Sequence, residues 1–140
     1  MTPKEKILTK IGNLKRYVEY LHSHSSLTKS DLKKNYTLQS AIERNLQLAI
    51  ETLFDIGEIL ISDLQLKKPE SYREIILILG EAKIFPKSFV NRIAPIAGFR
   101  NILIHKYSEI DLDLLLSHLQ DDLSDFDEFS HHVATYLKKK

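Results

Sequence analysis

Four residues in the stretch 98–107 have side chains that suit phosphodiester chemistry. Arg100 is a permanent cation with a planar fork of five donors, and His105 can act as an acid or a base near neutral pH. Tyr107 adds a hydroxyl that donates or accepts a hydrogen bond, and Asn101 adds an amide directly after the arginine. If these side chains converge, they form a site that binds a phosphate group and transfers a proton.

The spacing of the four residues limits how they can meet. At about 100° per residue, Arg100 and His105 lie roughly 140° apart on a straight helix. Asn101 and His105 share one face of such a helix, and Arg100 and Tyr107 nearly share another. One straight helix therefore cannot gather all four side chains. We expect either a helix that ends near His105 or a second copy of the site across a dimer.

These residue types predict chemistry on RNA. His105 would take a proton from a 2′-hydroxyl or give one to the leaving oxygen, a contribution of about 10²–10⁴ in rate. Arg100 would bind the non-bridging oxygens, while Asn101 would orient the imidazole or the phosphate. The 2′-hydroxyl is an internal nucleophile, so the reaction needs no metal, and DNA lacks this group. The alternative is that Arg100, His105 and Tyr107 only cap a helix and tie it to the acidic segment 109–113.

The composition indicates one folded domain without a cofactor. A chain of 140 residues, 43% of them hydrophobic, is long enough for one core, so we expect a single domain over residues 1–140. The sequence has no cysteine, which excludes thiolate metal sites and suits a reducing cytoplasm. It has no signal-peptide core and no apolar segment near the ~20 residues of a membrane span, so we expect a cytoplasmic protein. The adjacent His131 and His132 point apart on a helix, and we expect no metal and no cofactor.

Hydrophobic periodicity predicts the helices that position the four residues. Apolar residues recur every three or four positions in five ranges, which are 2–24, 36–64, 72–79, a range that starts at 86 and ends near His105, and 112–137. Thr2 and Ser71 are expected to cap helices, Gly80 to end one and Pro95 to kink another. The long helix 36–64 is apolar on more than one side, and its Gly57 is expected to allow close approach of another helix. We predict an all-α fold, an up-and-down bundle of four or five helices.

The charges are unevenly distributed along the chain, although the net charge is only +1. Residues 1–34 hold eight Lys and Arg against three acidic residues, whereas residues 109–128 hold eight Asp and Glu and no Lys or Arg. One interpretation is that these are two solvated helix faces. The other is that they form a basic surface for RNA phosphates and an acidic surface for a basic partner. A net charge near zero is not typical of a dedicated high-affinity nucleic-acid binder.

The motif R-x4-H-x-Y, formed by Arg100, His105 and Tyr107, resembles the signature of the HEPN superfamily. The flanking run 97–107 is similar to that of the HepT toxins of HepT/MntA-type toxin–antitoxin pairs. The run Ala-Ile-Glu-Arg-Asn-Leu-Gln at residues 41–47 in the long helix is also similar to this group. The resemblance covers essentially the whole chain.

The resemblance implies a small HEPN-like helical bundle that forms a homodimer, with the motif lining a cleft at the interface. It implies a metal-independent endoribonuclease toxin that cleaves tRNA or mRNA, in which Arg100, His105 and Tyr107 are catalytic and Asn101 is supporting. It also implies a cognate MntA-like nucleotidyltransferase antitoxin that attaches AMP to Tyr107. The alternatives are a non-catalytic HEPN-type dimeric module that partners a nucleotidyltransferase, or a helical dimerisation domain with an incidental motif.

Overall fold

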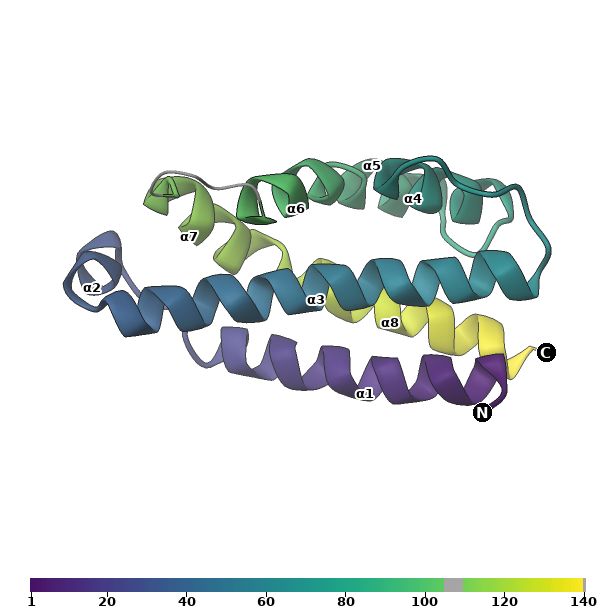
Figure 1. Cartoon of the computed structure of the whole chain (residues 1–140), viewed down its shortest axis with the longest axis horizontal. Coiled ribbons are helices and arrows are strands. Elements are labelled where there is room, and N and C mark those ends of the chain that lie inside the picture. Colours follow the sequence, from purple (N-terminus) through teal and green to yellow (C-terminus); the bar gives the residue numbers. More distant parts are fainter. Residues whose placement is uncertain (105–109, 140) are drawn as a thin grey trace.

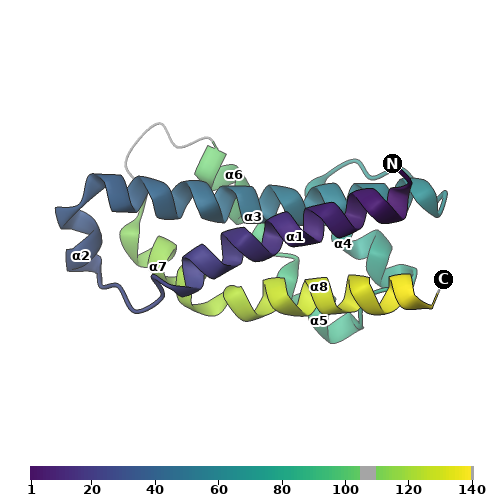
Figure 2. The same cartoon turned by 90° about the horizontal axis from the view of Figure 1, so that it is seen from below.

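The structure is a computed structural model, and it describes residues 1–104 and 110–139. These residues form helices and no strands, so the predicted all-α class is confirmed. The described part contains eight helices, which are α1 (Pro3–His22), α2 (Lys29–Lys34), α3 (Tyr36–Asp63), α4 (Tyr72–Glu81), α5 (Lys87–Ile93), α6 (Ile96–Ile104), α7 (Leu112–Asp121) and α8 (Leu123–Lys138). Figures 1 and 2 show α1, α3 and α8 running along the length of the molecule, with α4, α5 and α6 following one another beside them.

Side chains cap α1 and α4 at Thr2 and Ser71, the positions that the sequence predicts, and Asn35 is a further cap that it does not predict. The hydroxyl of Thr2 accepts a hydrogen bond from the backbone N of Glu5 at 3.1 Å, at the start of α1. The hydroxyl of Ser71 accepts one from the backbone N of Glu74 at 3.1 Å, at the start of α4. The side chain of Asn35 does the same at the start of α3, at 3.0 Å. Each bond satisfies a first-turn N–H group that has no partner within its own helix.

Helix α3 forms the centre of the bundle. It contacts α1, α2, α4, α6 and α8, so its apolar residues are buried on several sides, as its sequence predicts. Gly57 in α3 lies against α4, where an added Cβ would come within 2.5 Å of Ile75 Cγ2. The expected close approach at Gly57 is therefore confirmed. Neither α3 nor any other helix of the described residues is both long and apolar enough to cross a membrane.

The described part has more helices than the four or five predicted, for three reasons. The periodicity does not reveal the short helix α2, which begins with reciprocal bonds between Thr28 and Asp31. The predicted helix that starts at Pro86 is divided into α5 and α6 around Pro95, where the sequence predicts only a kink, because proline lacks a backbone N–H. The predicted helix 112–137 is divided into α7 and α8 at Asp122, whose side chain bonds back to α7 at His118.

The end of α4 also differs from the prediction. The helix continues through Gly80 to Glu81, so the prediction that Gly80 ends it is wrong. An added Cβ at Gly80 would lie 2.7 Å from Cγ2 of Val90, so the glycine is needed for the contact between α4 and α5. Lys83 instead takes the left-handed conformation after the helix, with φ of 63°, and its backbone N donates to the carbonyl of Gly80 at 3.0 Å.

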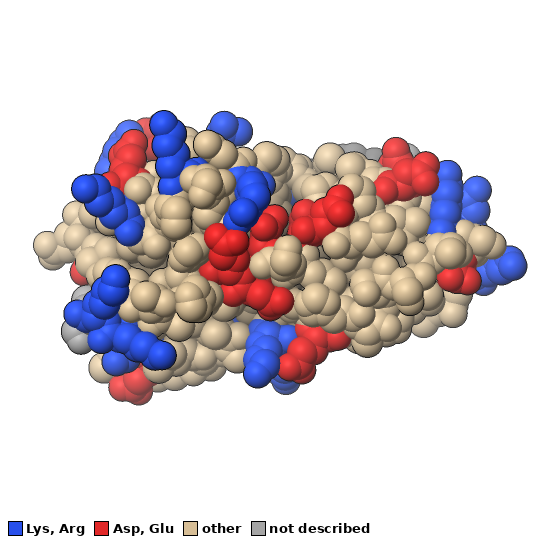
Figure 3. All heavy atoms as spheres, turned by 180° about the vertical axis from the view of Figure 1, so that it is seen from behind, with Lys and Arg blue, Asp and Glu red and all other residues tan. Residues whose placement is uncertain are grey.

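The basic segment 1–34 and the acidic segment 109–128 meet in the structure. The Nζ atom of Lys29 in α2 lies 3.1 Å from Oδ2 of Asp113 in α7. The Nε2 atom of His22 lies 3.5 Å from Oδ2 of Asp127 in α8. The Lys29–Asp113 ion pair therefore balances part of the charge of each segment with that of the other. On the face shown in Figure 3, acidic side chains gather near the middle and basic side chains lie mostly toward the ends.

Candidate active site

Helix α6 carries the two described residues of the predicted site, Arg100 and Asn101, and it is held by α7. Phe99 in α6 is buried, and its ring stacks on that of His118 with the centroids 3.7 Å apart. His118 is fixed in turn by Asp122, whose Oδ2 atom lies 2.6 Å from Nδ1. This contact fixes α6 immediately before Arg100.

The side chain of Arg100 reaches α3 and α4. Its Cζ atom lies 4.2 Å from the centre of the Tyr72 ring, which is a cation–π contact. Its Nη2 atom lies 4.0 Å from Oε1 of Glu51 in α3, where the two charges attract each other without forming a hydrogen bond. Only 18% of the Arg100 side chain is exposed, so most of it is shielded from water.

Helix α3 holds both neighbours of Arg100 in place. The Tyr72 ring packs on the buried ring of Phe54, with the centroids 4.8 Å apart. The amide of Gln47 donates to Oε1 of Glu51 at 3.1 Å, one turn earlier on the same helix face. The central helix of the bundle therefore sets the position of the guanidinium, although Arg100 itself belongs to α6.

Several donors of Arg100 have no strong acceptor within the described residues. Its Nη1 atom donates to Oδ1 of Asn101 at 3.4 Å, which is long for a hydrogen bond. Its Nε atom is buried and has no hydrogen-bond partner in the described part of the chain. A buried donor without an acceptor costs roughly 1–3 kcal/mol, so an anion that accepts from this guanidinium would be bound favourably. The charge and the donor fork suit the oxygens of a phosphate.

His105 and Tyr107 lie outside the described residues. The predicted roles of these two side chains, and the predicted convergence of all four, therefore remain predictions. Asn101 is exposed, and its contact within the described residues is the long one with Arg100. The described residues contain no group of three or more His, Asp or Glu side chains that could hold a metal ion.

Sequence reasoning missed the two residues that hold the guanidinium. Tyr72 is visible in the sequence only as part of the capping pattern that begins α4, and Glu51 only as a polar position on the long helix. One signal for Glu51 was present, because Gln47 and Glu51 are four residues apart and form a stabilising pair on a helix. No local pattern indicates that either residue contacts Arg100.

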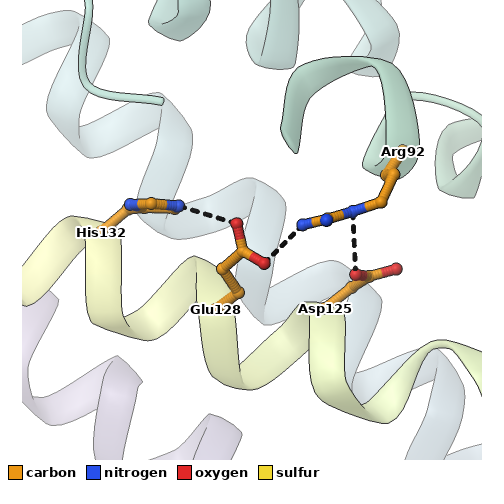
Figure 4. Close-up of polar contacts among 4 residues, drawn as sticks. All are labelled: Arg92, Asp125, Glu128 and His132. Atoms are coloured by element: carbon orange, nitrogen blue, oxygen red, sulfur yellow. Dashed lines mark hydrogen bonds and ion pairs between the residues drawn. The ribbon is translucent and has the colours of Figure 1, made fainter. Parts of the chain in front are cut away.

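A second arginine, Arg92 in α5, lies in a different environment. Figure 4 shows its guanidinium directed at Asp125 and Glu128 of α8. Its Nε atom lies 3.6 Å from Oδ1 of Asp125, and its Nη2 atom donates to Oε1 of Glu128. The bond from His132 to Glu128, at 2.9 Å, and that from Arg92 hold the pKa of Glu128 below its ordinary value, whereas burial raises the pKa of Asp125. Arg92 thus joins two helices and shares its charge with two carboxylates.

Comparison with known proteins identifies the family. A family model described as ribonuclease HepT-like matches residues 7–133. The chain belongs to the HepT-like ribonuclease family. Among curated HepT relatives, the mRNA nuclease HepT of Shewanella oneidensis is 29% identical over 123 residues, which are 88% of this chain and 92% of the relative. The tRNA nuclease HepT of Aphanizomenon flos-aquae is 27% identical over 131 residues, which are 94% and 89% of the two chains.

Solved structures of HepT-like toxins have the same fold. The tri-AMPylated HEPN toxin of Shewanella oneidensis, in complex with MNT antitoxin, matches with a TM-score of 0.82 at 28% identity, over 92% of this chain and 96% of that chain. A toxin–antitoxin complex with AMP-PNP matches with a TM-score of 0.83 at 27% identity, over 92% and 97% of the chains. The predicted resemblance to the HEPN superfamily and its HepT toxins is therefore confirmed.

Proposed function

We propose that this HepT-like protein is the toxin of a toxin–antitoxin pair and acts as a metal-independent endoribonuclease. The observation that carries the proposal is the state of Arg100, which is mostly shielded from solvent yet keeps donors that no described residue uses. A cation held in this way suits a phosphate whose charge increases during the reaction. The names of the two HepT relatives, an mRNA nuclease and a tRNA nuclease, support RNA as the substrate.

The proposed reaction uses the 2′-hydroxyl of the RNA as its nucleophile. His105 accepts the proton of this hydroxyl, the 2′-oxygen attacks the adjacent phosphorus, and the bond from phosphorus to the 5′-oxygen breaks. The leaving 5′-oxygen takes a proton from a protonated imidazole, which gives a 2′,3′-cyclic phosphate and a 5′-hydroxyl. Arg100 donates to the non-bridging oxygens, and Asn101 and Tyr107 position the phosphate.

We infer that the active unit is a homodimer. The reaction needs both a base and an acid, and two copies of His105 across a two-fold interface would supply them. Ile102, in α6 beside the site, is 46% exposed, and a partner protomer would cover it. An added Cβ at Gly98 would meet nothing within 4 Å, so the surface of α6 is also open there.

Cleavage of RNA in the presence of EDTA tests the proposed activity. The purified protein should cut total RNA under these conditions and leave cyclic or 3′-phosphate ends. His105→Ala should remain folded by circular dichroism and be inactive, whereas His131→Ala, which changes an exposed histidine of α8, should remain active. Activity that survives in His105→Ala, or that requires a divalent metal, would contradict the mechanism.

We also infer that a MntA-like nucleotidyltransferase neutralises this toxin by attaching AMP to Tyr107. The tri-AMPylated toxin of Shewanella oneidensis, solved with MNT antitoxin, supports this inference. An AMP group on Tyr107 would place a phosphate in the motif of Arg100 and compete with RNA for its donors. Co-expression with such an enzyme should add one or more AMP masses to the peptide that contains Tyr107. An unmodified peptide in a fully neutralised complex would indicate inhibition by binding alone.

A second candidate function is a non-catalytic module that only binds a nucleotidyltransferase. The two solved toxin–antitoxin complexes favour it as far as binding is concerned. Such a module would form the complex but would cut no RNA under any condition. The EDTA experiment above therefore separates the two candidates.

A further inference from the structure

A basic cavity lies at the end of the bundle that carries both termini. Its volume is about 500 Å³, and it lies between the connection from α4 to α5 and the last turns of α8. This volume is in the range of pockets for small ligands. The polar side chains that line it are Lys83, Lys87, His132, Thr135, Tyr136 and Lys139. In Figure 3 this end is on the left, where basic side chains lie on both sides of an uncharged strip.

The described residues do not compensate the charge of this cavity. No Asp or Glu is among its described lining residues, and none of its three lysines has an ion-pair partner in the described part of the chain. Other lysines do have such partners, since Lys10, Lys29 and Lys67 lie 3.6, 3.1 and 3.8 Å from carboxylate oxygens. Glu128 contacts His132 at the cavity, but it also accepts from Arg92. Within the described part of the chain, the cavity therefore presents three lysines without an ion-pair partner to an anion.

The walls of the cavity are fixed by packing. Phe85 is buried, and its ring lies 5.3 Å from those of both Phe89 and Phe129. The ring of His132 lies 5.1 Å from that of Phe89. These contacts join the start of α5 to α8 beneath the lysines, so a ligand would meet a preformed surface.

The two lysines of the α4–α5 connection are placed by its backbone. Lys83 has φ of 63°, a conformation that residues other than glycine rarely adopt. The close contact of Gly80 with Val90 brings the start of α5 beside the end of α4. Lys83 and Lys87 therefore line the same cavity from the two sides of the connection.

We propose that this cavity binds phosphate groups of the RNA strand on which the protein acts, at a distance from the Arg100 site. The inference rests on the proposed ribonuclease function and adds a substrate-binding surface to it. Lysine binds phosphate as a compact point charge, and the hydroxyls of Thr135 and Tyr136 can donate to phosphate oxygens. The Tyr136 ring is half-buried at the cavity and offers a face on which a base can stack.

The affinity for an uncleavable RNA tests this site. The probe is a fluorescent single-stranded oligonucleotide with 2′-O-methyl groups, which has no free nucleophile, and binding is followed by anisotropy at several salt concentrations. The first variant carries Lys83→Gln, Lys87→Gln and Lys139→Gln. Its matched control carries Lys15→Gln, Lys33→Gln and Lys68→Gln, which change three exposed lysines outside the cavity and alter the net charge equally.

The cavity variant should bind RNA at least tenfold more weakly than the control variant. Its plot of log affinity against log salt should be less steep by about 2, because each lost phosphate contact on a single strand removes ~0.7 from the slope. Lys87→Gln alone should reduce the slope by about 0.7, which keeps the test decisive if the triple variant is unstable. Equal affinities and slopes in the two triple variants would overturn the site.

Two further outcomes distinguish a site for an RNA strand from a protein-docking surface and from a mononucleotide pocket. Loss of antitoxin binding with unchanged RNA affinity would overturn the proposal, because it would make the cavity a protein-docking surface. AMP that binds the wild type as tightly as the oligonucleotide would overturn the proposal of a strand. A wild type that binds RNA through these lysines but never cuts it would refute the catalytic function and leave the binding site standing.

Discussion

Arg92 and Arg100 lie on the consecutive helices α5 and α6, and each places its guanidinium over an aromatic ring. The Cζ atom of Arg92 lies 5.5 Å from the centre of the Phe89 ring, and that of Arg100 lies 4.2 Å from the centre of the Tyr72 ring. The arginine with more carboxylate partners is also the more exposed of the two. Arg92 is 52% exposed and contacts two carboxylates, whereas Arg100 is 18% exposed and has, among the described residues, one carboxylate at 4.0 Å.

The difference separates a structural arginine from one that is available to a ligand. The charge of Arg92 is shared between Asp125 and Glu128, and these contacts join α5 to α8. The Arg100 guanidinium has a nearer ring but, among the described residues, weaker acceptors, and these residues leave several of its donors unused at the cost of partial desolvation. An arginine that must bind a phosphate cannot be neutralised in advance by carboxylates. The described neighbours of Arg100 meet this requirement, and those of Arg92 do not.

Replacing each arginine by alanine gives the largest expected effect. Arg100→Ala should lower the turnover of RNA cleavage by about 10²–10³, which is typical of losing one donor to a developing negative charge. Arg92→Ala should retain near wild-type cleavage and instead lower the melting temperature, because it removes the contacts between α5 and α8. Turnover and thermal unfolding are measured on both variants. Equal losses of turnover would contradict the assignment of different roles.

Changing the ring under Arg100 should give an intermediate effect. Tyr72→Leu keeps an apolar contact with Phe54 but removes the aromatic face, and a cation–π contact is worth about 0.5–2 kcal/mol. Its kcat/KM for RNA should therefore fall by roughly 2- to 30-fold. Tyr72→Phe keeps the face and should cleave at nearly the wild-type rate. If Tyr72→Phe lowers kcat/KM as much as Tyr72→Leu does, the hydroxyl and not the ring supports Arg100.

Most of the helices could be predicted because their signals are local. Thr2, Asn35 and Ser71 each accept the hydrogen bond that begins a helix, and the apolar periodicity identifies the buried faces. One error arose where a distant contact decides a local conformation, and another where the sequence has no helix-breaking residue. Gly80 resembles a helix stop, but its missing Cβ serves the contact with Val90 in another helix. The break at Asp122 contains neither proline nor glycine and so has no local signal.

The candidate site was predictable only in part for the same reason. The prediction of Arg100 and Asn101 as site residues rests on residue types and on spacing within one helix, where geometry is regular. The contacts of Arg100 with Tyr72 and Glu51 depend on how α4 and α6 lie on α3, which in turn depends on the close approach at Gly57. Spacing along a chain cannot show a contact that three separate helices create.

The smallest expected effect is in the pH dependence of the Arg92 contacts. Bonds from His132 and Arg92 hold the pKa of Glu128 below its ordinary value of 4.5. Its charged form therefore stabilises the fold above about pH 4.5, and this contribution is lost as the pH falls through the lower, folded pKa. Glu128→Gln should lower the melting temperature by about 1–4 °C at neutral pH, and the difference should vanish in acid.

The pKa of Asp125, the other carboxylate that contacts Arg92, is shifted in the opposite direction to that of Glu128. Burial raises the pKa of Asp125 above its ordinary value of 3.8, so ionising this carboxyl costs more free energy in the folded than in the unfolded state despite Arg92. Asp125→Asn should therefore leave the melting temperature at neutral pH equal to or above that of the wild type. Melting curves from pH 3 to 7 on both variants measure this contrast. If both variants lower the melting temperature equally at neutral pH, the two carboxylates contribute equally to the contact with Arg92. If Glu128→Gln lowers the melting temperature and Asp125→Asn raises it, the stabilising contact of Arg92 is the one with Glu128.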